Sequence, residues 1–185
     1  MPVQIGSQAH SFGDPTGLLS DCHRRIEMFM RVLEKLAQII DSPPEGEVRQ
    51  SLEAALRYFR EAAPKHKADE EQSLFPRLRK VESPQLRAAF AKLEELELDH
   101  RWSEPLHSRI DRLGQEYLSK GRLSGAQIGE FRDSVSELSA MYLRHIAVED
   151  KILFPAAVQA LSDADKQMIA EEMAKRRALP LVSPA

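Results

Sequence analysis

Apolar residues recur every three or four positions along four long segments of this chain, which is the spacing that one face of an α-helix produces. The first stripe runs from Leu18 to Ile40 and includes Ile26 and Leu33. Polar and charged residues occupy the positions between them, so each segment is predicted to be an amphipathic helix with one buried face. No segment shows the two-residue alternation of a strand. The pattern therefore predicts an all-α protein.

Helix-start and helix-stop residues divide the pattern into four long helices and a short fifth. Asp14 before Pro15 is an N-cap followed by proline at the first helical position, and Ser83 before Pro84 repeats that signal. Capping boxes are predicted where Ser42, Ser124 and Ser162 stand three residues before an acidic or amide side chain. The first predicted helix spans about 15–41, and the second follows the cap at Ser42 and runs to about 80. The third spans about 84–121, the fourth runs from the cap at Ser124 to about 161, and the short helix follows Ser162.

Long helices joined by short connections pack most simply as an antiparallel up-and-down four-helix bundle. The short C-terminal helix would then cover one end or edge. We expect the bundle to occupy residues 14–178, between a flexible arm at 1–13 and a flexible tail at 179–185. Pro64 and Pro76 should bend or stop the second helix.

Composition excludes several classes of function. The chain has 185 residues, 42% of them hydrophobic, which suits one domain with a real core. Its net charge of -3 arises from basic and acidic residues in mixed order, so no basic face for nucleic acid is predicted. The absence of a long apolar run or an apolar N-terminal segment favours a cytoplasmic protein without membrane contact. The single cysteine, Cys22, excludes an internal disulfide.

An eleven-residue pattern occurs twice, at 66–76 and at 145–155. Each copy places a histidine four residues before a glutamate, as His66 with Glu70 and as His145 with Glu149. On a helix the two side chains share one face about 6 Å apart along the axis, a spacing at which both can bind one metal ion. A single pair of this kind is usually a weak surface pair. Its duplication favours a metal site.

Two further histidines precede the copies at similar intervals, since His23 lies 43 residues before the first copy and His100 lies 45 before the second. Each long helix thus contributes to a common interior site. Two shared carboxylates and two imidazoles per ion would give each of two metals four protein ligands and leave positions open. Imidazole and carboxylate without thiolate suit iron first, with manganese, nickel or zinc as alternatives.

Other polar residues near these positions are weaker candidates. Glu104 is a candidate for an additional metal ligand, His107 is a weaker one, and Tyr142 could donate a phenol proton. A ferritin-like site is excluded because both Glu-x-x-His patterns of this chain fall on one predicted helix. The acids expected to hydrogen-bond to the ligand imidazoles are Asp69, Glu71, Asp99 and Asp150.

The six residues resemble the hemerythrin-like family, also called the HHE cation-binding domain, over about residues 15–161. The resemblance implies a non-haem centre of two iron ions with an oxo or hydroxo bridge, in which Glu70 and Glu149 bridge the metals. Oxygen-carrying members have a further histidine at the position of Glu104 and end on an aspartate five residues after the last histidine. The ligand set is closer to the di-iron proteins linked to iron-sulfur cluster repair, although residues 1–14 cannot form their cysteine-bearing N-terminal domain.

Three functions remain open at this point. The first is binding or sensing of dioxygen, nitric oxide or peroxide at an open metal position, in a stress response. The second is an enzyme that handles nitric oxide or peroxide. The third is iron storage or delivery. The expected partner is thus a small diatomic ligand or peroxide, and the sequence leaves the question of protein partners open.

Overall fold

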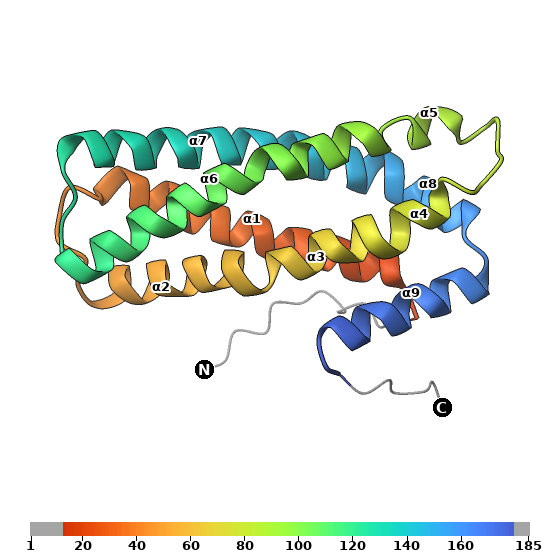
Figure 1. Cartoon of the computed structure of the whole chain (residues 1–185), viewed down its shortest axis with the longest axis horizontal. Coiled ribbons are helices and arrows are strands. Elements are labelled where there is room, and N and C mark those ends of the chain that lie inside the picture. Colours follow the sequence, from red (N-terminus) through yellow and green to blue (C-terminus); the bar gives the residue numbers. More distant parts are fainter. Residues whose placement is uncertain (1–12, 180–185) are drawn as a thin grey trace.

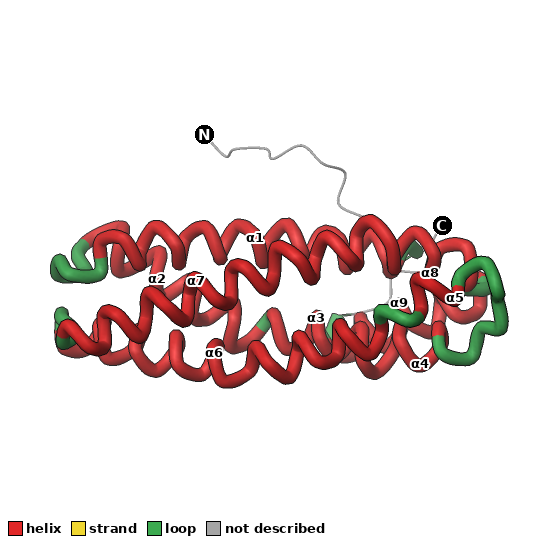
Figure 2. The backbone as a smooth tube through the Cα atoms, turned by 90° about the horizontal axis from the view of Figure 1, so that it is seen from above, coloured by secondary structure: helices red, strands yellow, loops and turns green. Residues whose placement is uncertain are grey.

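The computed structural model describes residues 13–179, and every regular element in this range is helical, which confirms the predicted fold class. Four helical arms, each corresponding to one of the predicted long helices, run side by side along the long axis of the molecule (Figures 1 and 2). The predicted arm at 1–13 and tail at 179–185 lie outside the described residues, except for Gly13 and Leu179. The helices are α1 (Pro15–Ile39), α2 (Gly46–Glu61), α3 (Ala63–Asp69), α4 (Phe75–Leu78), α5 (Arg87–Phe90), α6 (Leu93–Lys120), α7 (Gly125–Val148), α8 (Phe154–Ala160) and α9 (Asp163–Arg176).

Most predicted helix ends are confirmed. The Asp14 carboxylate accepts a hydrogen bond of 2.9 Å from the Gly17 N–H at the start of α1. Ser124 and Ser162 form the capping boxes expected of them, and Gly121 ends α6 in the left-handed conformation with φ of 74°. These local signals fix where each arm begins or ends.

Two predicted starts are wrong. Ser42 does not cap the second arm, because α2 begins at Gly46 after Glu45 and has no side-chain cap. The third long helix begins at Leu93 instead of residue 84, after the separate turn of α5. No residue of α5 is buried, so its apolar side chains gain little from continuing the helix into α6.

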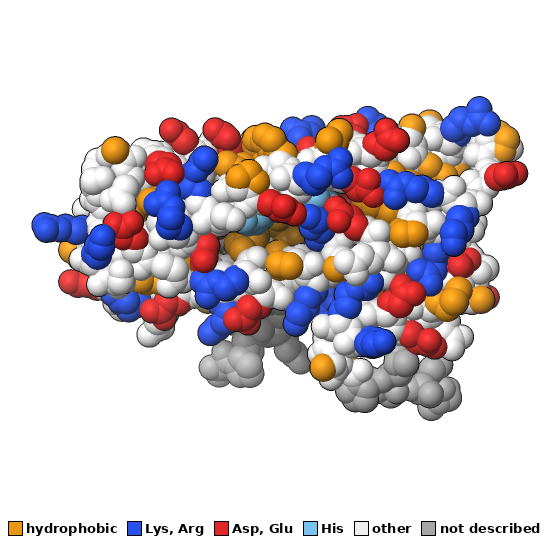
Figure 3. All heavy atoms as spheres, in the orientation of Figure 1, with side chains coloured by type: hydrophobic (Ala, Val, Ile, Leu, Met, Phe, Trp, Pro, Cys, Tyr) orange, Lys and Arg blue, Asp and Glu red, His pale blue; other side chains and the backbone are white. Residues whose placement is uncertain are grey.

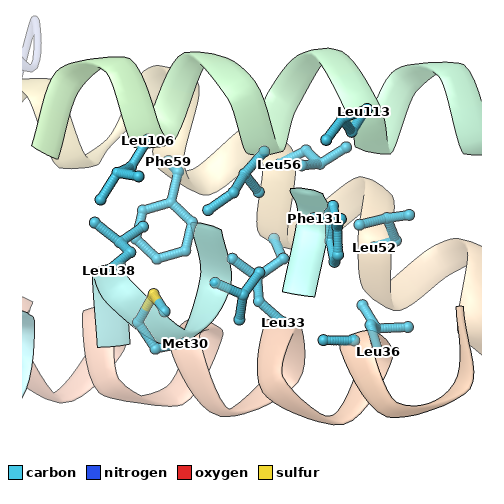
Figure 4. Close-up of a cluster of buried hydrophobic side chains, with 14 of the residues drawn as sticks. Met30, Leu33, Leu36, Leu52, Leu56, Phe59, Leu106, Leu113, Phe131 and Leu138 are labelled. Carbon is cyan, nitrogen blue, oxygen red and sulfur yellow. The ribbon is translucent and has the colours of Figure 1, made fainter. Parts of the chain in front are cut away.

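The core consists of two clusters of buried side chains. One lies between α1, α2, α6 and α7 and includes Leu33, Leu56 and Leu138 (Figure 4). The other includes Leu19, at the start of α1, and Ile169 of α9. In each arm a buried histidine stands along the chain between residues of the two clusters, and in two arms a buried glutamate follows it. The histidines are His23, His66, His100 and His145, and the glutamates are Glu70 and Glu149. The arms therefore surround a polar zone that apolar packing closes at both ends.

Helix α9 lies against α3 through an ion pair at a fully buried carboxylate. Asp69 has no exposed surface, and its oxygens bind Arg176, at 2.8 Å, and Arg177. Arg176 also donates to the Ser73 hydroxyl at 2.8 Å. The short helix covers an edge of the bundle beside the polar zone, as expected. No helix of the described range is long and apolar enough to cross a membrane.

Candidate metal centre

A wide helical turn follows each histidine of the duplicated pattern. Residues 70–74 and 149–153 form single π-helical turns, in which the N–H of Phe75 donates to the carbonyl of Glu70 and the N–H of Phe154 donates to that of Glu149. Proline follows each turn, has no N–H and crowds the carbonyl four residues before it, which the wider turn relieves. Each glutamate of the pattern thus stands at the first residue of a π turn.

All six predicted ligand residues converge in the polar zone. His23, His66, Glu70 and Glu149 place one ligand atom each within 4.8 Å of one another, and so do Glu70, His100, His145 and Glu149. All six residues are buried. Both groups contain the same two glutamates, so the carboxylates stand between one pair of histidines and the other.

The ligand atoms fit bound cations better than hydrogen bonds to each other. Nε2 of His66 lies 3.2 Å from Glu70, and Nε2 of both His23 (3.1 Å) and His145 (3.2 Å) lies near Glu149. Nevertheless all four carboxylate oxygens and Nε2 of His23 are buried without a hydrogen bond. Buried polar atoms are almost always satisfied in proteins. Metal ions between these groups would satisfy them, and the donor set matches such ions.

Three of the four imidazoles are held by acids on their other nitrogen. Nδ1 of His23 lies 2.8 Å from Asp150, Nδ1 of His100 lies 2.9 Å from Glu71, and Nδ1 of His145 lies 3.3 Å from Asp99. These contacts fix the tautomer that leaves Nε2 free for a metal. Three of the four expected acids thus have the predicted place, and the fourth, Asp69, instead pairs with the arginines of α9.

The phenylalanine of each copy packs on a histidine of the other half of the chain. Phe75 stacks on His100 with an interplanar angle of 4°, and Phe154 stacks on His23 at 10°. The repeat of the phenylalanine at 75 and 154 in the duplicated pattern is the sequence signal that could have indicated these two contacts.

Comparison with known proteins agrees with this geometry. The model of the hemerythrin HHE cation binding domain matches residues 14–172. The chain belongs to this family. It is also 29% identical over 181 residues to a protein of Haemophilus influenzae described as uncharacterized, and the alignment covers 96% of this chain and 98% of that relative. The hemerythrin-like resemblance is thereby confirmed, and the buried histidines and glutamates are the candidate site of a metal-binding domain.

Charges in the centre of the HHE domain make most of its imidazoles basic. Burial lowers the pKa of His145, but the charge of Glu149 and the hydrogen bond to Asp99 outweigh it and raise the pKa to about 10. Burial also lowers the pKa of His23, but the interactions with Asp150, Glu149 and Glu70 outweigh it and raise this pKa well above its usual range. Cations must therefore displace protons here, and metal affinity should fall as pH falls.

A cavity of about 500 Å³ connects the centre with the surface between α6 and the arm formed by α2 and α3. All four ligand histidines line its floor, and apolar side chains such as Leu56 and Phe59 line its walls. Figure 3 shows histidine and hydrophobic atoms at the bottom of a hollow on this face. The HHE centre is thus accessible from its histidine side.

Two ion pairs cross the mouth of this cavity from the α2–α3 arm to α6. Arg60 binds Asp111, and Lys67 binds Glu104. The side chain of Glu104 is 62% exposed, and Glu104 belongs to neither group of clustered ligand atoms within residues 13–179. The candidate additional ligand therefore lies at the entrance of the cavity.

His107 and Tyr142 form a hydrogen-bonded pair in the cavity wall, with 2.9 Å between Nε2 and the hydroxyl oxygen. Burial lowers the pKa of His107 to about 4 and raises the pKa of Tyr142. Both side chains are consequently neutral near pH 7. The pair offers a hydroxyl and an imidazole to a molecule in the cavity, one helical turn from His145.

Replacing His107 with glutamine should flatten the pH dependence of stability. In the unfolded chain the pKa of His107 is near 6.5, whereas in the folded protein it is about 4. Between these pH values the unfolded chain therefore binds a proton that the folded protein does not bind. This contribution is complete above pH 6.5 and is lost as pH falls. Between pH 7 and pH 4.5 the metal-free wild type should lose about 2–3 kcal/mol more unfolding free energy than His107→Gln. Urea denaturation at both pH values measures the difference, and equal losses would contradict the neutral state of His107.

Proposed function

We propose that this HHE domain holds two iron ions and binds a small ligand, dioxygen, nitric oxide or peroxide, at coordination positions that the protein leaves open. The observation that carries the proposal is that both ligand groups share Glu70 and Glu149 while their histidines line an accessible cavity. Four protein ligands per ion are fewer than iron usually takes, so a molecule in the cavity can complete the coordination.

Each residue of the centre has a separate task in this proposal. His23 and His66 would hold one ion, His100 and His145 would hold the other, and Glu70 and Glu149 would serve both. A reduced iron pair supplies electrons and vacant positions to the ligand. The acids behind the imidazoles keep Nδ1 protonated and Nε2 available.

The cavity walls and the pair formed by His107 and Tyr142 set the surroundings of the ligand. Leu56, Phe59 and Ile110 give the walls an apolar surface that favours a small uncharged molecule. When the neutral imidazole donates to the Tyr142 hydroxyl, the hydroxyl can donate its own proton to a molecule beside it. When the imidazole accepts that proton, the hydroxyl oxygen can accept a hydrogen bond from the molecule.

The Tyr142→Phe variant should keep its metal ions and release the bound ligand faster than the wild type. Removal of one hydrogen bond between uncharged groups costs about 1 kcal/mol, or a roughly fivefold faster dissociation of bound ligand. Stopped-flow absorption with the iron-loaded protein measures that rate. Leu143→Ala, at a surface residue one position further along α7 that is 77% exposed, is the matched control and should not change it. An unchanged rate in Tyr142→Phe would exclude the tyrosine from ligand binding.

Anaerobic iron-loaded protein tests the proposed function directly. Its absorption spectrum should change on addition of dioxygen, nitric oxide or peroxide, and manganese- or zinc-loaded protein should not show the same bands. No spectral response to any of the three ligands would refute the proposal. Steady-state consumption of peroxide or nitric oxide would favour an enzyme, and rapid loss of both ions to a chelator would favour storage or delivery.

A further inference from the structure

The two halves of the centre are related residue by residue. His23 corresponds to His100, and the pair of His66 and Glu70 corresponds to that of His145 and Glu149. The geometry repeats as well, because the imidazole centroids of each pair lie 4.9 Å apart in the first half and 4.7 Å in the second. A difference between corresponding positions is therefore a difference between the two metal positions.

One set of supports is the same in both halves. Asp150 follows Glu149 and holds Nδ1 of His23, whereas Glu71 follows Glu70 and holds Nδ1 of His100. The distances of 2.8 and 2.9 Å are nearly equal. The two histidines that stand alone in their arms are thus supported alike.

The other set of supports is present in one half only. Asp99 precedes His100 and holds Nδ1 of His145. The residue that precedes His23 is Cys22, and Nδ1 of His66 is buried without a hydrogen-bond partner. A thiol is a weak hydrogen-bond acceptor, so Cys22 cannot replace a carboxylate. His66 is the one ligand imidazole that no acid in the described range supports.

We propose that the two metal positions of this domain are unequal, and that the position of His23 and His66 binds its ion more weakly and exchanges it faster. This inference rests on the proposed pair of metal ions, and it assigns the difference to Cys22 at the place of Asp99. Loss of such an outer hydrogen bond typically lowers metal affinity by about 10–100-fold. The position of His100 and His145 should therefore bind its ion first and release it last.

Chelator competition measures the difference in the wild-type protein. Protein loaded anaerobically with iron(II) is mixed with an excess of a chromogenic iron(II) chelator, and release is followed in time. One ion per chain should leave at least about 10 times faster than the other. Simultaneous release of both ions would overturn the proposal. Failure to load two ions would instead refute the proposed function, so the two failures are distinct.

Substitutions at the corresponding residues Cys22 and Asp99 assign the fast phase to one metal position. Cys22→Asp supplies the missing acid and should slow the fast phase by about 10-fold or more, while Cys22→Ala offers no hydrogen-bond acceptor, is the control and should leave it unchanged. Asp99→Cys removes the acid that supports His145, as in the half that contains His66, and should accelerate the slow phase. If neither the Cys22→Asp nor the Asp99→Cys protein alters its phase, the assignment is wrong, even where wild-type release is biphasic.

Circular dichroism of the metal-free variants separates this effect from misfolding. If Cys22→Asp does not fold, Asp99→Cys alone decides the assignment. This variant puts no new charge into the protein, because it only removes the largely buried carboxylate of Asp99. An unchanged slow phase in folded Asp99→Cys protein would then overturn it.

Discussion

The Glu70→Ala protein should lose most of its bound metal. The carboxylate belongs to both groups of clustered ligand atoms, so its removal takes one ligand from each ion. Because loss of a supporting residue already costs about 10–100-fold in affinity, loss of a shared ligand should cost more than about 100-fold for each ion. Metal analysis after dialysis against a weak chelator measures the loss. His145→Ala should behave alike at one ion and weaken the second less.

Glu104→Ala is the matched control for this change. Glu104 is an acid of the cavity lining, and its exposed carboxylate pairs with Lys67 at the mouth. Its removal should leave both ions in place, with at most a small effect on ligand entry. Full retention of metal by Glu70→Ala, or equal loss in both variants, would show that the six clustered residues are not the ligands.

Replacing Asp69 with alanine should destabilise the domain more than any change at an exposed ion pair. The buried carboxylate is shared by Arg176 and Arg177, whose side chains are 20% and 22% exposed, and both would lose it. Breaking a buried pair costs about 3 kcal/mol or more. For a chain of this length that lowers Tm by roughly 6–12 °C, which differential scanning calorimetry of the metal-free protein measures.

The Asp41→Ala variant serves as the control for Asp69→Ala. Asp41 binds Arg132 at 2.9 Å, but its side chain is 62% exposed, and such pairs contribute at most about 1 kcal/mol. Its Tm should stay within roughly 3 °C of the wild type. Equal shifts in the two variants would mean that α9 adds little to the stability of the bundle.

The sequence was sufficient for the arms and for the identity of the clustered residues. Apolar spacing identifies which face of each arm is buried, and His66, Glu70, His145 and Glu149 fall on those faces by their own spacing. The duplication then converts two weak patterns into one site, because two copies on different arms of a bundle point to the same interior. His23 and His100 followed from the same repeat.

Features that depend on contacts between arms could not be predicted. The π turns arise from the conflict between Pro76 or Pro155 and a continuous helix inside a packed bundle, and a sequence shows the proline but not the packing. Asp69 and Glu71 are two residues apart, yet Asp69 meets arginines because α9 packs on one side, while Glu71 meets His100 because α6 packs on the other. The entrance position of Glu104 likewise depends on Lys67 of another arm.

Metal analysis of anaerobically purified protein, combined with its absorption spectrum before and after exposure to air, tests the central claim most directly. The claim is that two ions share the carboxylates of Glu70 and Glu149. We expect two irons per chain and new charge-transfer bands in air. A protein that binds one ion or none when supplied with excess iron(II) would contradict it.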